Sequence, residues 1–177
     1  MRKLVLGLAA AALLATATPA LAKKGVVFVH GKGGTDLASQ SVANAYWGSD
    51  MLRATTKGYA VPYLVFHYDG TQYMWVAAGQ VAGQITTWMN ANAVDEIQVV
   101  THSFGGVVLR WILSNPTYDS RYPAIISRIQ RVNALAPPNR GSEAANLAGT
   151  LSGSWLTGWL VGLVGQDNDS TKNCTTS

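Results

Sequence analysis

Apolar residues follow two alternating patterns along the chain: short continuous runs, and longer stretches with helical spacing. A short apolar run bounded by glycines is typical of a strand buried on both faces, whereas apolar residues three or four positions apart are typical of a helix. The patterns predict strands over 25–29, 60–67, 97–100 and 129–135, and helices over 47–56, 73–91 and 105–113. This alternation predicts the α/β class, with a mostly parallel sheet flanked by helices.

The first residues form a pattern of their own. Arg2 and Lys3 precede an apolar run, and a small-residue motif closes the segment at Ala22. These features are typical of a secretory signal peptide, and the run is shorter than the roughly 20 residues that a membrane-spanning helix needs. We expect residues 1–22 to be a cleavable signal peptide, residues 23–177 to form one domain, and the protein to be secreted or periplasmic.

Composition narrows the range of partners. Charged residues make up 12% of the chain, and the formal net charge of +4 includes two residues of the leader. A charge that is weak and mixed in sign predicts no nucleic-acid partner. The only cysteine is Cys174. In an exported chain, an odd cysteine leaves two alternatives open: an unpaired thiol, or a disulfide partner outside these residues.

Ser103 occupies the turn between a predicted strand and a predicted helix, over 97–100 and 105–113. In the motif Gly-x-Ser-x-Gly, small residues two positions before and after the serine permit a sharp strand–turn–helix that presents the serine hydroxyl. The sequence here keeps Gly105 and has Thr101 in place of the first glycine. Ser103 is therefore the candidate nucleophile.

A glycine-rich loop, His30-Gly31-Lys32-Gly33-Gly34, follows the first predicted strand. The tetrahedral intermediate of an acyl transfer needs two converging N–H donors. We expect these donors to be the backbone amides of Lys32 and of Phe104, the residue directly after the nucleophile. Each motif is weak evidence alone, but their order at the ends of two strands strengthens both.

Together with Leu-Ala-Pro-Pro-Asn-Arg-Gly-Ser over 135–142, these motifs resemble the α/β-hydrolase superfamily. Within it they are similar to the lipase and esterase branch that includes GPI-inositol deacylases, over roughly residues 25–148. The resemblance implies a Ser-acid-His triad that hydrolyses carboxylic esters of small molecules or lipids through an acyl-enzyme intermediate. It implies no metal or other cofactor, and it is compatible with transient contact with a membrane or lipid surface.

The same resemblance leaves the triad incomplete. In this fold the acid and the histidine follow the nucleophile, but His30, His67 and His102 all precede Ser103. The acidic residues after the serine are Asp119, Glu143, Asp167 and Asp169. Asp119 comes too early, before the strand over 129–135, and Glu143 directly follows the Arg-Gly-Ser turn. Asp167 and Asp169 lie nearer the expected region, but no predicted strand precedes them. We expect the C-terminal strands to be missing and the base to lie beyond residue 177. The alternative is a catalytically incomplete protein of this fold that binds lipid or a protein partner.

An apolar, tryptophan-rich stretch covers residues 144–165. It follows 135–142, at the position where the resemblance implies a lid over the active site. Its helical spacing fits a core helix equally well. Both interpretations stay open from the sequence.

Overall fold

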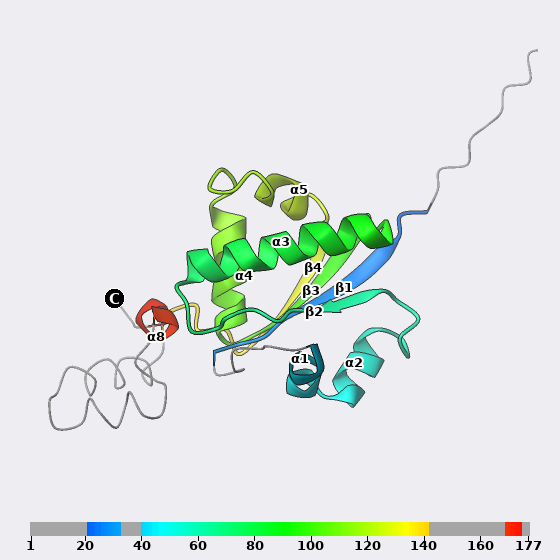
Figure 1. Ribbon diagram of the computed structural model, residues 1–177, viewed down its shortest axis with the longest axis horizontal. Helices are drawn as coiled ribbons and strands as arrows, with labels where there is room; N and C mark the ends of the chain where they lie inside the picture. Colours follow the sequence, from blue (N-terminus) through cyan, green and yellow to red (C-terminus); the bar gives the residue numbers. More distant parts are fainter. Residues whose placement is uncertain (1–20, 33–39, 142–168, 175–177) are drawn as a thin grey trace, which may run out of the picture.

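The computed structural model describes residues 21–32, 40–141 and 169–174. Its centre is a four-stranded sheet in which all paired strands run parallel, in the order β2-β1-β3-β4. The strands are β1 (Lys24–Val29), β2 (Tyr63–Val65), β3 (Glu96–His102) and β4 (Ile129–Leu135). The predicted class, a mostly parallel sheet flanked by helices, is confirmed (Figure 1).

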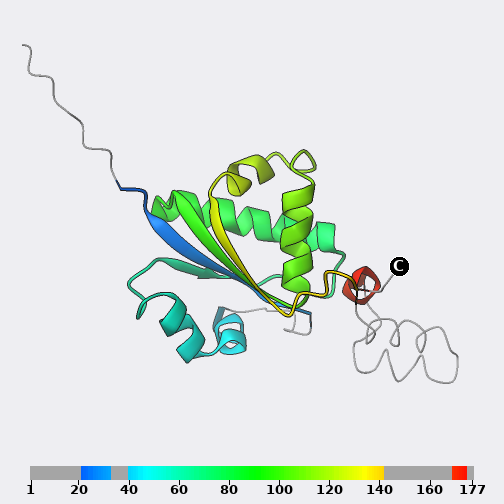
Figure 2. The ribbon, with the colours of Figure 1, turned by 180° about the vertical axis from the view of Figure 1, so that it is seen from behind.

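Helices cover the two faces of the sheet unequally (Figures 1 and 2). One face carries α3 (Met74–Asn92), α4 (Phe104–Ser114) and α5 (Tyr122–Ile126). The other carries the shorter helices α1 (Gln40–Trp47) and α2 (Ser49–Thr55). A last short helix, α8 (Asp169–Asn173), reaches the start of α3, where the Asn173 side chain accepts a hydrogen bond from the Met74 amide at 2.6 Å.

The strand pleat divides the core into two clusters. Successive side chains of β1 point to opposite faces, so Val27 joins the cluster under α3 and α4 while Phe28 joins the cluster under α1 and α2. The first cluster is the larger, and Ile85 and Tyr122 are fully buried in it. The second is built around Phe28 and Trp47, whose ring centroids lie 5.2 Å apart. The sheet therefore has one thickly covered face and one thinly covered face.

The predicted helix over 47–56 is wrong in its first turn. Helix α1 ends at Trp47, Gly48 has a φ of 74°, and α2 begins at Ser49. A left-handed φ cannot continue a right-handed helix and favours glycine, so Gly48 turns the chain between two short helices. The predicted strand over 60–67 narrows to β2, because the chain is still in a turn where the Val61 amide donates to the Thr56 carbonyl.

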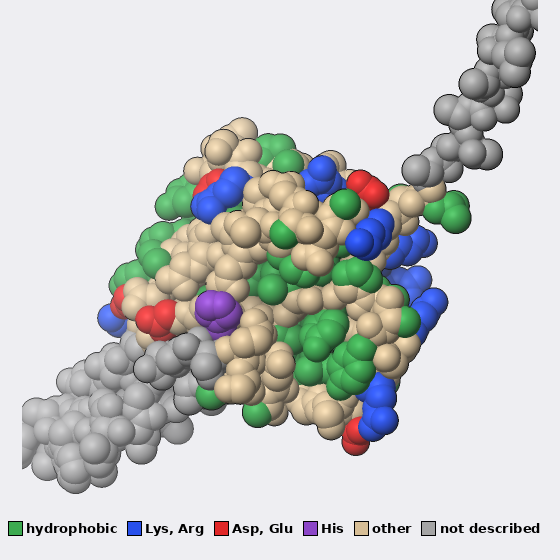
Figure 3. All heavy atoms as spheres, turned by 45° about the vertical axis from the view of Figure 1, so that its right-hand side comes forward, with side chains coloured by type: hydrophobic (Ala, Val, Ile, Leu, Met, Phe, Trp, Pro, Cys, Tyr) green, Lys and Arg blue, Asp and Glu red, His purple; other side chains and the backbone are tan. Residues whose placement is uncertain are grey.

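The other predicted elements are confirmed with shifts of a few residues at their ends, and β4 has the predicted bounds. Helices α1, α5 and α8 were not predicted, and α5 and α8 have five residues each, which is too few to show a period. No described helix is long and apolar enough to cross a membrane. The stretch over 144–165 lies outside the described residues. Figure 3 shows one face of the molecule, on which neutral side chains predominate and charged ones are scattered.

Candidate active site

Ser103 lies in the turn between β3 and the first residue of α4. Its φ and ψ are 50° and −125°, a conformation that is uncommon for a residue with a side chain. Two backbone hydrogen bonds of 2.9 Å hold it: the Ser103 amide donates to the Leu135 carbonyl, and the Ser103 carbonyl accepts from the Gly106 amide. The strand–turn–helix expected of a nucleophile elbow is therefore present at this serine.

Gly105 allows the turn to pack directly against the end of β1. A Cβ at this position would lie 2.3 Å from the carbonyl oxygen of Val29 and 2.4 Å from that of His30. Both distances are far shorter than a carbon–oxygen contact tolerates, and both neighbours are backbone atoms. The glycine two residues after the serine is thus required by close packing.

Thr101, two residues before the serine, lies in the core. Its side chain is fully buried, and its hydroxyl has no hydrogen-bond partner among the described residues. A Cβ on Gly106 would lie 3.4 Å from that hydroxyl oxygen and 2.7 Å from the Cβ of Pro137. Gly106 therefore lets the start of α4 lie close to Pro137 in the loop after β4, with the Thr101 hydroxyl at ordinary contact distance.

The glycine loop after β1 meets the elbow. A Cβ on Gly31 would lie 2.7 Å from the Cβ of Ser103, so the loop backbone touches the serine. The Gly31 amide donates to the Tyr46 hydroxyl at 3.0 Å, and the same hydroxyl is hydrogen-bonded to Nδ1 of His102. Burial raises the pKa of Tyr46, which keeps this hydroxyl protonated. Tyr46 thus links the loop to the residue before the serine, a link that no local sequence pattern indicated.

The His30 side chain holds the glycine loop through a hydrogen bond to its backbone. Its Nδ1 lies 2.7 Å from the Gly31 carbonyl oxygen, and because a carbonyl only accepts, Nδ1 carries the proton. The ring stacks on Tyr68 at 4.1 Å, and the Tyr68 hydroxyl donates to the His30 carbonyl at 2.5 Å. Burial lowers the pKa of His30, so the ring is neutral at pH 7. This histidine therefore holds the loop through its neutral form.

The two expected amide donors belong to the segments that meet here. Phe104 is the first residue of α4, and its fully buried side chain anchors the start of that helix. The first N–H groups of a helix have no partner within the helix, so they are available to an anion. Lys32 follows Gly31 and is the last described residue of the loop. The structure thus brings the Lys32 loop and the Ser103–Phe104 turn together.

Among the described residues, no histidine or carboxylate is hydrogen-bonded to the Ser103 hydroxyl. His102 is paired with Tyr46, and His67 is exposed at the end of the segment after β2. The two Asp119–Arg121 side-chain hydrogen bonds lower the pKa of Asp119 to about 2, and Asp169 pairs with Lys172 at 3.3 Å. Glu143 and Asp167 lie outside the described residues. The described part of the chain also holds no group of three or more His, Cys, Asp or Glu side chains that could bind a metal ion.

Cys174, directly after α8, is buried in the larger core cluster. Burial raises the pKa of its thiol. The thiol therefore lies in packed apolar surroundings and not in a frayed tail. A disulfide with a cysteine outside these residues stays a prediction.

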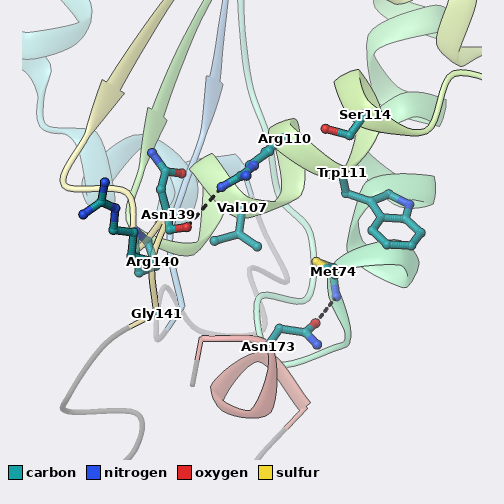
Figure 4. A pocket seen from close by; sticks show the side chains of 10 residues that line it. Met74, Val107, Arg110, Trp111, Ser114, Asn139, Arg140, Gly141 and Asn173 are labelled. Atoms are coloured by element: carbon teal, nitrogen blue, oxygen red, sulfur yellow. Dashed lines mark hydrogen bonds between the residues drawn. The ribbon is translucent and has the colours of Figure 1, made fainter. Parts of the chain in front are cut away.

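A cavity of about 460 Å³ opens along α4 (Figure 4), and Ser103 is not among the residues that line it. Val107, Arg110 and Trp111 line it from α4, four to eight positions after Ser103 and on one side of the helix. Its other walls come from the start of α3, the loop over 138–141 and Asn173 of α8. Sequence analysis missed this cavity because its walls are far apart in the chain.

No family model and no curated protein sequence matches the chain. Several solved structures are similar to it. The lipase BlEst2 of Bacillus licheniformis in its propeptide form matches with a TM-score of 0.63 and 23% identity, over 90% of this chain and 31% of that one. Its mature form matches with a TM-score of 0.59 and 24% identity, over 90% of this chain and 58% of that one.

The phospholipase PlaB of Legionella pneumophila, in complex with thio-NAD, matches with a TM-score of 0.54 and 18% identity, over 86% of this chain and 31% of that one. The chain thus spans between 31% and 58% of the lengths of these three structures. At such identities a likeness shows the fold. With its parallel sheet, flanking helices and these structural neighbours, the chain adopts the α/β-hydrolase fold.

Proposed function

We propose that this chain carries the nucleophile and the oxyanion-binding elements of a serine hydrolase that acts on carboxylic esters. The observation that carries the proposal is Ser103 at a positive φ between β3 and α4, with the Gly31 backbone packed against its Cβ. A solvent-reaching serine held in a strained turn beside a glycine loop is the arrangement that acyl transfer requires. The structural neighbours named as a lipase and a phospholipase support an ester or lipid-ester substrate.

In the proposed reaction, Ser103 Oγ attacks the acyl carbon while a base takes its proton. The carbonyl oxygen becomes an oxyanion and accepts hydrogen bonds from the amides of Lys32 and Phe104. The bond to the leaving alcohol then breaks as the alcohol receives that proton, which gives an acyl-enzyme intermediate. Water hydrolyses the intermediate and regenerates the serine. The amide of Phe104 lies at the positive end of the α4 dipole, which further favours the negative charge.

We place the acid and the base of the triad after residue 177, in the order usual for this fold. The three histidines of the chain support this placement, since His30 is held under the loop, His102 is paired with Tyr46, and His67 is exposed. We also propose the GPI-inositol-deacylase-like branch, from the motif over 135–142, and export, from the leader over 1–22. Transient contact with a lipid surface follows if the substrate is a lipid ester.

A fluorophosphonate probe tests the nucleophile. In a protein extended by the downstream coding sequence, the probe should label the chain, and Ser103→Ala should abolish labelling. Ser127→Ala is the matched control, because Ser127 is exposed and its hydroxyl bonds only to the nearby Ala124 carbonyl. In the 177-residue chain alone, labelling should be weak, since no histidine or carboxylate of the described residues is hydrogen-bonded to the Ser103 hydroxyl. Labelling that persists in Ser103→Ala would remove Ser103 from this role. A folded extended protein that resists the probe would favour a non-catalytic lipid or partner binder.

Two substitutions at one position test the oxyanion loop. Lys32→Ala keeps the backbone donor, so hydrolysis of a short-chain ester should be largely retained. Lys32→Pro removes the N–H, so turnover should fall on the order of 10²-fold, as for other single oxyanion donors. Equal losses from both changes would show that the lysine side chain matters and the amide does not. Thermal unfolding of both variants reports whether the loop still folds.

A further inference from the structure

The cavity along α4 is bordered by cations and by no described carboxylate. Arg110 lines it from α4, and Arg140 lines it from the loop after β4. Its described lining includes no Asp or Glu. Charged residues are sparse in this chain, at 12%, so two guanidinium groups at one cavity make a local positive potential.

The polar groups of the cavity wall are mainly donors. Arg110 Nη1 donates to the Asn139 carbonyl at 3.1 Å, which fixes the guanidinium at the rim and leaves its other N–H groups available (Figure 4). The Asn173 side-chain oxygen accepts from the Met74 amide, so its NH₂ group remains as a donor. The Arg140 guanidinium has no hydrogen bond or ion pair with the described residues. Groups of this kind favour an anionic acceptor.

Among the described residues, the carboxylates closest in sequence to the cavity walls have other partners. Asp169 in α8 pairs with Lys172 at 3.3 Å, and Asp119 pairs with Arg121. Asp69, before α3, accepts from the backbone and hydroxyl of Thr71. These carboxylates are occupied locally, so none of them pairs with Arg110 or Arg140.

The rest of the cavity is apolar. Met74, Val107 and Trp111 form its wall between α3 and α4. The Trp111 ring continues into a series of aromatic rings, with centroids 5.8 Å from Trp75 and 5.3 Å from Tyr118. A volume of about 460 Å³ is within the range of small-molecule sites. The cavity therefore offers one cationic end and one apolar wall.

We propose that this cavity binds an amphiphilic anion: an alkyl chain against Val107 and Trp111, with its phosphate or carboxylate held by Arg110 and by Arg140 at the mouth. Binding does not require Ser103 to react. Since an α-helix rises 1.5 Å per residue, Arg110 lies roughly 10 Å along α4 from Ser103. If the proposed ester hydrolysis is correct, the ligand is an anionic ester or the acid released from one.

Calorimetry with the full chain tests the site, using decyl phosphate below its micelle concentration. Decyl phosphate should bind, and Arg110→Gln should weaken it about tenfold, the effect of losing one charge-assisted hydrogen bond. Arg140→Gln should also weaken binding, and because the Arg140 guanidinium has no polar partner among the described residues, the thermal unfolding of this variant should match that of the unaltered chain. Arg131→Gln, an exposed arginine on β4 outside this cavity, is the matched control and should change nothing. Ser103→Ala should bind like the unaltered chain, which separates this test from the proposed hydrolysis.

Inorganic phosphate and decyl alcohol distinguish the two parts of the ligand. Each should bind at least about tenfold more weakly than decyl phosphate, because each lacks one of the two contacts. If inorganic phosphate bound as tightly as decyl phosphate, the proposal of an amphiphilic ligand would be wrong and the cavity would be a site for a simple anion. Equal binding of decyl alcohol or of decyltrimethylammonium, or affinity unchanged in both arginine variants, would overturn the anion site itself.

Discussion

Strands β3 and β4 are parallel neighbours of seven residues each, but their surroundings differ. Strand β3 pairs with β1 on one side and β4 on the other, and it buries Ile97, Val99 and Val100. No residue of β4 is buried, and within the described chain β4 pairs only with β3. Val99 and Val132 are partners in the ladder, and they are 0% and 40% exposed.

This difference shows that neighbours, and not residue type, decide the burial of a strand. Strand β3 leads into Ser103, and the carbonyls of β1 confine the turn that follows. Strand β4 carries Val132 and Leu135 on an exposed edge, the kind of surface on which further strands pair. The turn at Ser103 therefore follows a buried central strand and lies beside a strand with no buried residue.

The largest expected effect is at the turn after β3. Gly105→Ala should lower the free energy of unfolding by about 3 kcal/mol, because the methyl group must displace the carbonyls of Val29 and His30. Urea unfolding followed by circular dichroism measures the loss. The control is Gly79→Ala in α3, where a Cβ meets nothing within 4 Å and the change should stabilise by up to about 1 kcal/mol. Similar small effects at both glycines would contradict the packing described here.

The next largest difference in unfolding free energy is expected between Val99 and Val132, which are paired across β3 and β4. Val99→Ala removes two buried methyl groups and should cost about 2 kcal/mol in the same urea assay. Val132→Ala, the same substitution opposite it, should cost about 0.5 kcal/mol, because this side chain is 40% exposed. A cost at Val132 equal to that at Val99 would mean that β4 is covered in solution.

Tyr46→Phe should cost about 1 kcal/mol, because the Gly31 amide and Nδ1 of His102 both lose a hydrogen-bond partner. Hydrogen exchange of the Gly31 amide should become faster, which reports the release of the loop beside β3. Tyr59→Phe is the control, since the Tyr59 hydroxyl donates only to the Ser49 carbonyl at the surface. Unchanged exchange at Gly31 would show that Tyr46 does not hold the loop.

The smallest effect is a dependence on pH near neutrality. Because burial lowers the pKa of His30 from 6.5, the unfolded chain binds a proton at a pH where the folded chain does not. Stability should therefore fall as the pH is lowered, by at most about 0.7 kcal/mol between pH 7 and pH 6. The rings packed on His30 are Tyr46 and Tyr68, which are uncharged there because burial raises the pKa of both.

Substitution of His30 separates its contribution to the pH dependence of stability from the contributions of other titratable groups. His30→Gln should flatten the slope of unfolding free energy against pH, whatever its effect on stability at pH 7. His67→Gln, at an exposed position, should leave the slope unchanged. A slope that survives in His30→Gln would assign the dependence to other groups.

Sequence alone determined the order of the four strands, the helices α3 and α4 between them, and the turn at Ser103. The apolar runs over 25–29 and 97–100 could be recognised from local sequence, and both are largely buried in the structure. The turn at Ser103 could be predicted because the glycine that it requires, Gly105, is only two residues further along the chain. The break at Gly48 was missed because apolar spacing does not report backbone φ, and α5 because it is too short to show a period.

Only the tertiary structure decided which residues meet. Tyr46 reaches the Gly31 amide across 15 residues and His102 across 56, and Asn173 reaches Met74 across 99. None of these three contacts could be predicted from local composition, since tyrosine and asparagine both also occur at protein surfaces. The exposure of β4 and the arginines beside α4 are likewise set by which segments pack together. The spacing of apolar residues shows which face of a helix or strand is buried. A site, in contrast, is built from side chains that several helices, strands and loops bring to one place.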